Sequence, residues 1–160
     1  MTTTDTDAGT QTPPTGASMP AGYVTGVAYE AIIAFIRSQQ EDRGYTQPQF
    51  WLLRNLSPND LSPDGRGMSI AELRDAMSTY LRKEDDLESE ARVLLEKGWL
   101  ERDESDHLSI TPTGETALAG LKQFAPAIRA MLHQGIDDAD YATTVRVLTQ
   151  LIENAGGRLS

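Results

Sequence analysis

Side chains that can bind phosphate and read bases gather in one stretch of this 160-residue chain. Arginine and lysine bind phosphate, arginine also recognises guanine, and the hydroxyls of serine and tyrosine donate to phosphate oxygens. The chemistry that this stretch offers is therefore contact with phosphate and with base edges, and the alternative for each residue is an ordinary solvated or core-edge role. The candidate DNA-binding residues are Ser69, Tyr80, Arg82, Lys83, Ser89, Arg92 and Arg102.

Acidic side chains are interleaved with these donors. Residues 64–106 hold seven basic and thirteen acidic side chains, a net charge of −6, and the whole chain has a formal net charge of −10. Affinity for nucleic acid comes largely from neutralising phosphates, so this balance argues against DNA binding. The charge of the local face nevertheless matters more than the total.

Catalytic and metal-binding patterns are missing from the sequence. There is no cysteine, which excludes disulfides, thiolate switches and cysteine-bound zinc, and the two histidines, His107 and His133, have no ligand spacing. The acidic run at residues 84–90 lacks the alternating ligands and central glycine of a calcium loop. We predict a protein that is not an enzyme and that has no cofactor or metal.

Two helices and a β-hairpin are expected to position the donors. Ser69 and Glu72 have the spacing of a capping box, which begins a first helix. A second helix is predicted over residues 84–97, with an acidic first turn and with Gly98 as its C-terminal stop. Residues 99–110 then alternate as two short strands around a polar turn. With a preceding helix capped by Thr46 and Gln49, this order predicts a winged helix-turn-helix over residues 45–114.

Long apolar-striped helices are predicted on both sides of this module. The first covers residues 21–42, and its stripe is broader than one neighbour would cover. One long helix, kinked near Pro126, is predicted to continue to residue 134, and a last helix, capped by Asp137 or Asp138, ends near Asn154. These stripes can be buried within one chain or between two chains.

The remaining segments are a terminal tail and a loop, and neither carries a pattern of functional residues. Residues 1–19 are rich in Thr, Gly and Pro, which predicts a disordered tail, either passive or an arm that orders against a partner. Residues 57–67 form a turn-rich loop that is longer than usual. No signal peptide or membrane span is visible, so we expect a cytoplasmic protein with no membrane partner.

The stretch LLEKGWLER followed by LSITPTG resembles the MarR family of dimeric bacterial transcription regulators, and the resemblance extends over residues 21–156. It implies a homodimer on a palindromic DNA duplex, with residues 20–44 and 115–156 forming the dimerisation region. The matching positions are Leu94, Glu96, Lys97, Gly98, Leu100, Arg102, Ile110, Thr111 and Gly114.

The chain departs from this family where the family contacts DNA. In residues 86–90, the equivalent of the start of the reading helix, only Ser89 is well suited to DNA, and the hairpin tip has no arginine. Arg102 keeps the position at the base of the wing, where Asp103 or Asp106 is expected to pair with it.

The resemblance also implies a small aromatic ligand where the dimer helices meet the reading module. The alternative is that these aromatic residues are ordinary core residues. The candidate ligand-binding residues are Tyr23, Tyr29, Phe50, Trp51, Arg54 and His133.

The sequence therefore predicts a mainly α-helical protein with a small β-wing. Its predicted function is that of a MarR-like, ligand-responsive DNA-binding transcription regulator. The alternative is a winged-helix protein-interaction module that has lost DNA binding. The arrangement of Arg82, Lys83, Arg92 and Arg102 relative to the acidic residues is expected to discriminate between the two.

Overall fold

The computed structural model describes residues 16–159, which divide into two compact units between Phe35 and Ile36. The first unit contains the 3₁₀ helix η1 (Gly16–Ser18) and most of helix α1 (Ala21–Glu41), which continues into the second unit. Residues 16–18 were predicted as tail and instead form η1, whereas residues 1–15 of that predicted tail lie outside the described residues. None of the described helices is long and apolar enough to cross a membrane.

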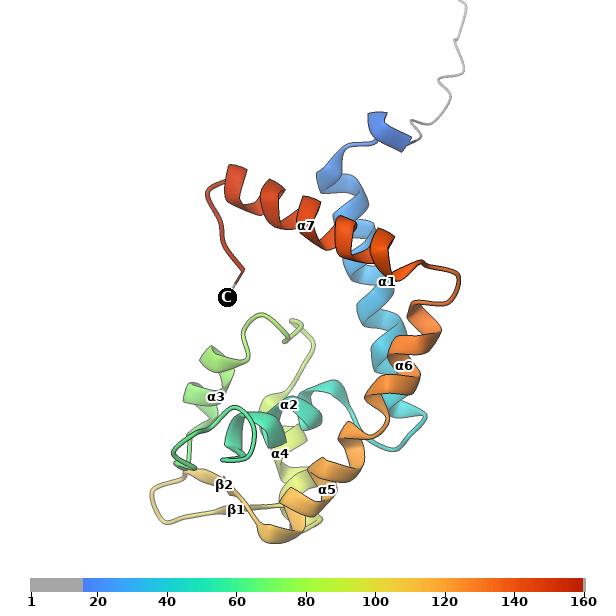
Figure 1. The fold of residues 1–160 in the computed structure, drawn as a ribbon. Helices are drawn as coiled ribbons and strands as arrows, with labels where there is room; N and C mark the ends of the chain where they lie inside the picture. The colour runs from blue at the N-terminus through green and yellow to red at the C-terminus, as the bar shows by residue number, and fades with distance from the viewer. Residues whose placement is uncertain (1–15, 160) are drawn as a thin grey trace, which may run out of the picture. The chain divides into compact units, whose positions relative to one another are not determined.

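The second unit contains the predicted helix, helix, helix, hairpin order, followed by three further helices (Figure 1). Its elements are α2 (Gln47–Leu56), α3 (Ile70–Ala76), α4 (Leu87–Glu96), β1 (Leu100–Arg102), β2 (Leu108–Ile110), α5 (Pro112–Lys122), α6 (Ala125–Leu132) and α7 (Asp138–Asn154).

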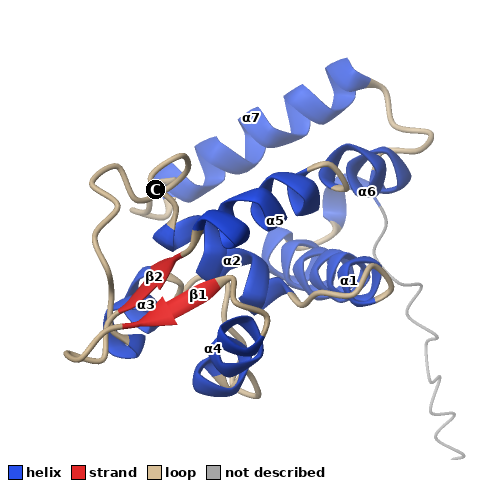
Figure 2. Cartoon of the chain, turned by 90° about the horizontal axis from the view of Figure 1, so that it is seen from below, coloured by secondary structure: helices blue, strands red, loops and turns tan. Residues whose placement is uncertain are grey.

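The two strands form the wing, and Figure 2 shows them side by side. They pair antiparallel, with Leu100 opposite Ile110 and Arg102 opposite Leu108. Met68, just before α3, adds an isolated bridge, because its N–H donates to the Leu108 carbonyl at 3.0 Å and its own carbonyl accepts in return at 2.8 Å. The wing is therefore joined to the segment that leads into α3.

The predicted helix caps are confirmed. The Ser69 hydroxyl accepts from the Glu72 N–H, the Glu72 carboxylate accepts from the Ser69 N–H, and Thr46 begins α2 with the equivalent box. Thr111 caps α5, whose first residue is proline, and Gly98 beyond α4 has a φ of +71°. That left-handed backbone is the reason for a glycine at this position.

One apolar core lies between α2, α3, α4, the wing and α5. The buried faces of α3 and α4 are those that the sequence predicts, except that Ile70 is only partly buried. Phe50 and Trp51 are also partly buried, and pack against this core. The fully buried large side chains include Leu52, Leu53, Leu56, Leu73, Met77, Leu87, Leu94, Leu108 and Leu118.

Two helix boundaries differ from the prediction. α4 begins at Leu87 rather than at residue 84, because the Asp86 carboxylate accepts from the Ser89 N–H at 3.1 Å and so acts as the N-cap. The acidic residues 84–86 therefore precede the helix instead of forming its first turn. The single helix predicted from α5 to residue 134 is two helices, since Pro126 has no N–H to donate to the carbonyl of Lys122.

The long loop at residues 57–67 is fastened to the core by Asp60. Its carboxylate accepts two hydrogen bonds from Arg54 of α2, at 3.0 and 3.1 Å, and lies 2.5 Å from Nζ of Lys122 on α5. The Asp60 side chain is only 8% exposed. Burial alone would raise the pKa of Asp60, but the hydrogen bonds from Arg54 and Lys122 hold it below its ordinary value of 3.8.

Asp60→Asn is expected to destabilise the fold by about 3 kcal/mol at neutral pH, because two cations lose a buried partner. The contribution of a carboxylate with a lowered pKa is present above its ordinary value and is lost as the pH falls through the folded value. Urea unfolding at several pH values should therefore show the difference between wild type and variant closing below about pH 4. Asp64→Asn, in an exposed part of the same loop, is the control, and an equal loss there would contradict the role of Asp60.

Candidate DNA-binding site

The exposed face of α4 carries Ser89, Arg92, Val93 and Glu96. These residues lie three and four apart, so they share one side of the helix, opposite the side that is buried in the core. Arg92 makes no ion pair within 4 Å among residues 16–159. Of these four exposed side chains, one is basic and one is acidic, and the exposed Asp86 caps the start of the same helix.

The acidic residues near the start of α4 have partners within the second unit. Asp86 accepts from the N–H and, at 2.7 Å, from the hydroxyl of Ser89, and the hydroxyl hydrogen bond is the main cause that lowers the pKa of Asp86. The Glu90 carboxylate accepts from the hydroxyl of Thr46 at 2.8 Å and is partly buried. These carboxylates shape the start of the helix and its packing on α2.

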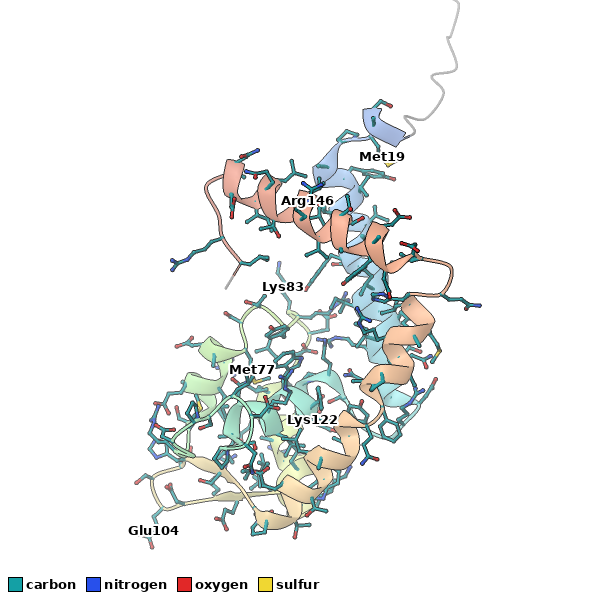
Figure 3. The ribbon with its side chains drawn as sticks, in the orientation of Figure 1. Met19, Met77, Lys83, Glu104, Lys122 and Arg146 are labelled. Carbon is teal, nitrogen blue, oxygen red and sulfur yellow. The ribbon has the colours of Figure 1, made fainter. Side chains whose placement is uncertain are left out.

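Arg102 is held at the base of the wing. Its Nη2 lies 2.7 Å from a Glu88 carboxylate oxygen on α4, and its Nη1 lies 2.7 Å from the Asp106 carboxylate. Hydrogen bonds to Asp106 and Glu88 raise the pKa of Arg102 above its ordinary value. The predicted pairing with Asp106 is confirmed, whereas the partner on α4 was missed. Glu104 lies at the wing tip (Figure 3).

Three candidate residues lie in the turn between α3 and α4. The ring of Tyr80 stacks on Trp51 of α2, with the ring centroids 3.7 Å apart. The Arg82 side chain is mostly buried, and its Nη1 lies 3.8 Å from Glu84. Lys83 is exposed, and Figure 3 shows its side chain extending away from the turn.

The predicted donors therefore divide into two groups. Lys83 and Arg92 are exposed basic side chains, whereas Arg82 and Arg102 are partly buried and form ion pairs with acidic neighbours. The hydroxyl of Ser69 accepts the capping hydrogen bond of α3 at 3.2 Å. Contact with DNA by any of these residues stays a prediction.

Four of the six predicted ligand-binding residues, Phe50, Trp51, Arg54 and His133, belong to the second unit. Phe50, Trp51 and Arg54 lie together on α2, with the Arg54 guanidinium 4.5 Å from the Trp51 ring centroid. Arg54 and Tyr80 cannot share one face of that ring, so both faces of Trp51 are covered. The His133 ring instead lies 4.3 Å from Tyr141.

Tyr23 and Tyr29 are exposed on the part of α1 that belongs to the first unit. Two shallow hollows border α5, and none of the six residues lines either of them. The ligand site stays a prediction. Within residues 16–159, no three carboxylate or histidine side chains are grouped as a metal site would require.

Arg37 is a second residue, besides Glu88, that the sequence analysis missed. It lies in the last part of α1 and forms two hydrogen bonds, at 2.7 and 2.8 Å, with the carboxylate of Asp85, just before α4. The two residues are 48 positions apart, and no spacing rule relates them. Asp85 was visible in the sequence only as a member of the acidic run, and Arg37 stands alone between Ile36 and Ser38.

The geometry defines a class of protein. Two helices joined by a turn, the second with a solvent-facing side, and a two-stranded wing make up a winged helix-turn-helix. The chain has the fold of the MarR transcription regulators, as comparison with solved structures shows. No protein-family model matches the sequence, and no curated protein is similar enough in sequence to count as a relative.

Three solved structures illustrate the fold match. The reduced form of MarR from E. coli aligns with a TM-score of 0.61 and 18% identity, over 84% of this chain and 94% of that one. A MarR family regulator from Silicibacter pomeroyi aligns with a TM-score of 0.64 and 18% identity, over 83% of this chain and 91% of that one. A MarR family protein of Mycobacterium tuberculosis in complex with p-aminosalicylic acid aligns with a TM-score of 0.60 and 21% identity, over 83% of this chain and 98% of that one.

Proposed function

We propose that this protein is a homodimeric transcription regulator that binds double-stranded DNA through α4 and the turn before it. The observation that carries the proposal is the exposed face of α4, where Arg92 has no ion pair within residues 16–159 while Asp85, Glu88 and Glu90 are bound to Arg37, Arg102 and Thr46. Such a protein would act in the cytoplasm and would not be an enzyme. The MarR fold supports this proposal.

The dimer is supported by apolar side chains that the single chain leaves in solvent. On α1, Val24, Val27 and Ile32 are each more than 40% exposed. On α7, Val145 and Leu151 are exposed to a similar degree, and α7 has no buried residue at all among its 17. Helices with unburied stripes are stabilised by a second copy, and a two-fold dimer would present two reading helices to a palindrome.

The predicted dimerisation segments, residues 20–44 and 115–156, and the reading module between them remain our proposed division of the chain. A small aromatic ligand is part of the proposal too. The structure of BpsR from Bordetella bronchiseptica aligns with a TM-score of 0.57 and 20% identity, over 86% of this chain and 97% of that one. The DNA binding of BpsR is regulated by 6-hydroxynicotinic acid. A ligand that binds one spacing of the reading helices better than another would shift the protein toward it.

Arg92→Ala tests the DNA-binding face. An arginine that contacts a base edge is worth about 1–3 kcal/mol, so the Kd for a duplex selected from a random pool should rise about tenfold or more. A gel shift at low and moderate salt measures the change. Since the Arg92 side chain has no ion-pair partner within residues 16–159, thermal stability should stay within about 0.5 kcal/mol of wild type.

Arg146→Ala is the matched control, because it removes the same charge from an exposed position on α7 (Figure 3). Its Kd should match that of the wild type. A folded wild-type dimer that neither shifts any duplex at low salt nor binds heparin would overturn the proposed function. Equal losses in both variants would mean that total charge, rather than the α4 face, determines binding.

A further inference from the structure

Arg37, near the end of α1, makes three sets of hydrogen bonds with the helix-turn-helix. Its Nε donates to the side-chain oxygen of Gln47 at 2.8 Å, and its Nη1 and Nη2 donate to the two carboxylate oxygens of Asp85 at 2.8 and 2.7 Å. Nη2 also lies 3.3 Å from the backbone carbonyl of Tyr80. The side chains of Arg37 and Asp85 are 15% and 7% exposed, so this is a largely buried ion pair.

Asp85 also closes the turn that leads into α4. Its Oδ2 accepts from the backbone N–H of Arg82 at 2.7 Å, and the next residue, Asp86, is the N-cap of α4. Burial alone would raise the pKa of Asp85, but the hydrogen bonds from Arg37 and from the Arg82 N–H hold it below its ordinary value. The carboxylate is therefore charged at neutral pH, and one group fixes both the turn and its position against α1.

The turn has a second anchor, and the two anchors come from different helices. The Tyr80 ring stacks on Trp51 of α2, which belongs to the core of the reading module itself. Arg37 belongs instead to α1, the helix that we propose for dimerisation. A planar guanidinium that forms two parallel hydrogen bonds with a carboxylate fixes orientation as well as distance. The start of α4 is therefore held in a defined orientation against the last residues of α1, from Ile36 on, which belong to the second unit.

We propose that Arg37 is a positioning residue for DNA binding: it ties the start of the reading helix to α1, so that the position of α1 determines how α4 is presented to DNA. This proposal rests on the proposed function. Arg37 itself need not touch DNA, because its guanidinium is directed at Asp85, Tyr80 and Gln47. Its loss should consequently affect recognition of a specific sequence more than general attraction to phosphate.

Arg37→Gln in the full-length protein tests the proposal by two measurements. Amide hydrogen exchange at residues 81–86 should become about tenfold faster or more, because the turn loses its anchor on α1. The Kd for the selected duplex should rise about tenfold, whereas the Kd for an unrelated duplex and the slope of affinity against salt should not change. Arg37→Lys keeps the charge without the two parallel hydrogen bonds, so it should restore little of the specific affinity.

Arg43→Gln is the control, since Arg43 lies just beyond α1 and hydrogen-bonds to Gln39, away from the turn. Asp85→Asn is the second variant, and its effect should be non-additive with that of Arg37→Gln because the two residues act as a pair. Unchanged hydrogen exchange at residues 81–86 in Arg37→Gln would show that Arg37 does not hold the turn. Faster exchange with unchanged specific affinity would overturn the positioning role, and full rescue by Arg37→Lys would too.

The measurements distinguish a failure of the proposed function from a failure of the role of Arg37. If the wild-type protein bound no duplex, the DNA-binding proposal and the role of Arg37 in it would both be wrong. The exchange measurement would still report whether Arg37 holds the turn, because it needs no DNA.

Discussion

Gly114→Ala is expected to destabilise the protein by about 3 kcal/mol or more, because a well-packed site cannot take an added methyl group without shifting backbone. A Cβ at this position would lie 2.1 Å from the backbone oxygen of Trp99 and 2.8 Å from a side-chain carbon of Ile110. The Trp99 carbonyl is itself fixed, since it accepts the N–H of Thr111 at 3.0 Å. Neither the wing nor the start of α5 can move away without breaking this link.

Thermal unfolding of the variant should show a midpoint lowered by roughly 10 °C, since 1 kcal/mol corresponds to about 2–4 °C in a chain of this size. Gly120→Ala provides the control within the same helix. A Cβ at Gly120 would meet nothing within 4 Å, so alanine there should raise stability by about 1 kcal/mol through its higher helix propensity. If Gly114→Ala lowers stability and Gly120→Ala raises it, the contact of Gly114 with the wing is the cause of the loss. An unchanged stability of Gly114→Ala would contradict this explanation.

Val145→Asp is expected to convert the proposed dimer into monomers. Val145 is 41% exposed in the single chain, so a charge there should cost the monomer little. In a two-fold interface, the substitution occurs twice and places two carboxylates in an apolar contact. A loss of about 5 kcal/mol would weaken dimerisation by more than about a thousandfold. Sedimentation velocity at micromolar concentration should then show a single species of 17.5 kDa.

Thr143→Asp adds the same charge to the opposite side of α7, where the side chain is also exposed. It should leave the dimer intact. If Val145→Asp still sedimented as a dimer, this side of α7 would not be in the interface. If both variants dissociated, the charge of α7 rather than its apolar stripe would govern assembly.

The acidic residues at the start of α4 have partners that the sequence does not reveal. Read along the chain, residues 84–90 form an acidic run that repels phosphate. In the folded protein, Asp85 is bound to Arg37 and Glu90 to Thr46, partners that lie 48 and 44 positions away. Glu88 is bound to Arg102. The count over residues 64–106 therefore left out Arg37, a cation from outside that segment that is paired with Asp85.

The sequence by itself determined the caps and the order of the elements. Ser69 with Glu72, Thr46 with Gln49, and Thr111 before Pro112 all stand where the helices begin. A capping hydrogen bond joins residues three positions apart, so its partners can be recognised without knowledge of the fold. The periodic stripes of α3 and α4 were recognisable for the same reason, since the repeat of a helix is local.

Only the tertiary structure decided how the long loop is fastened, how the turn before α4 is held, and which donors remain exposed. Asp60, in the loop, is paired with Lys122 of α5, and Asp85, before α4, is paired with Arg37 of α1. These pairs form between segments that the core brings together, and their energy depends on burial and orientation. Sequence separation encodes neither quantity, which is why the positions of the charged side chains had to be learned from the fold.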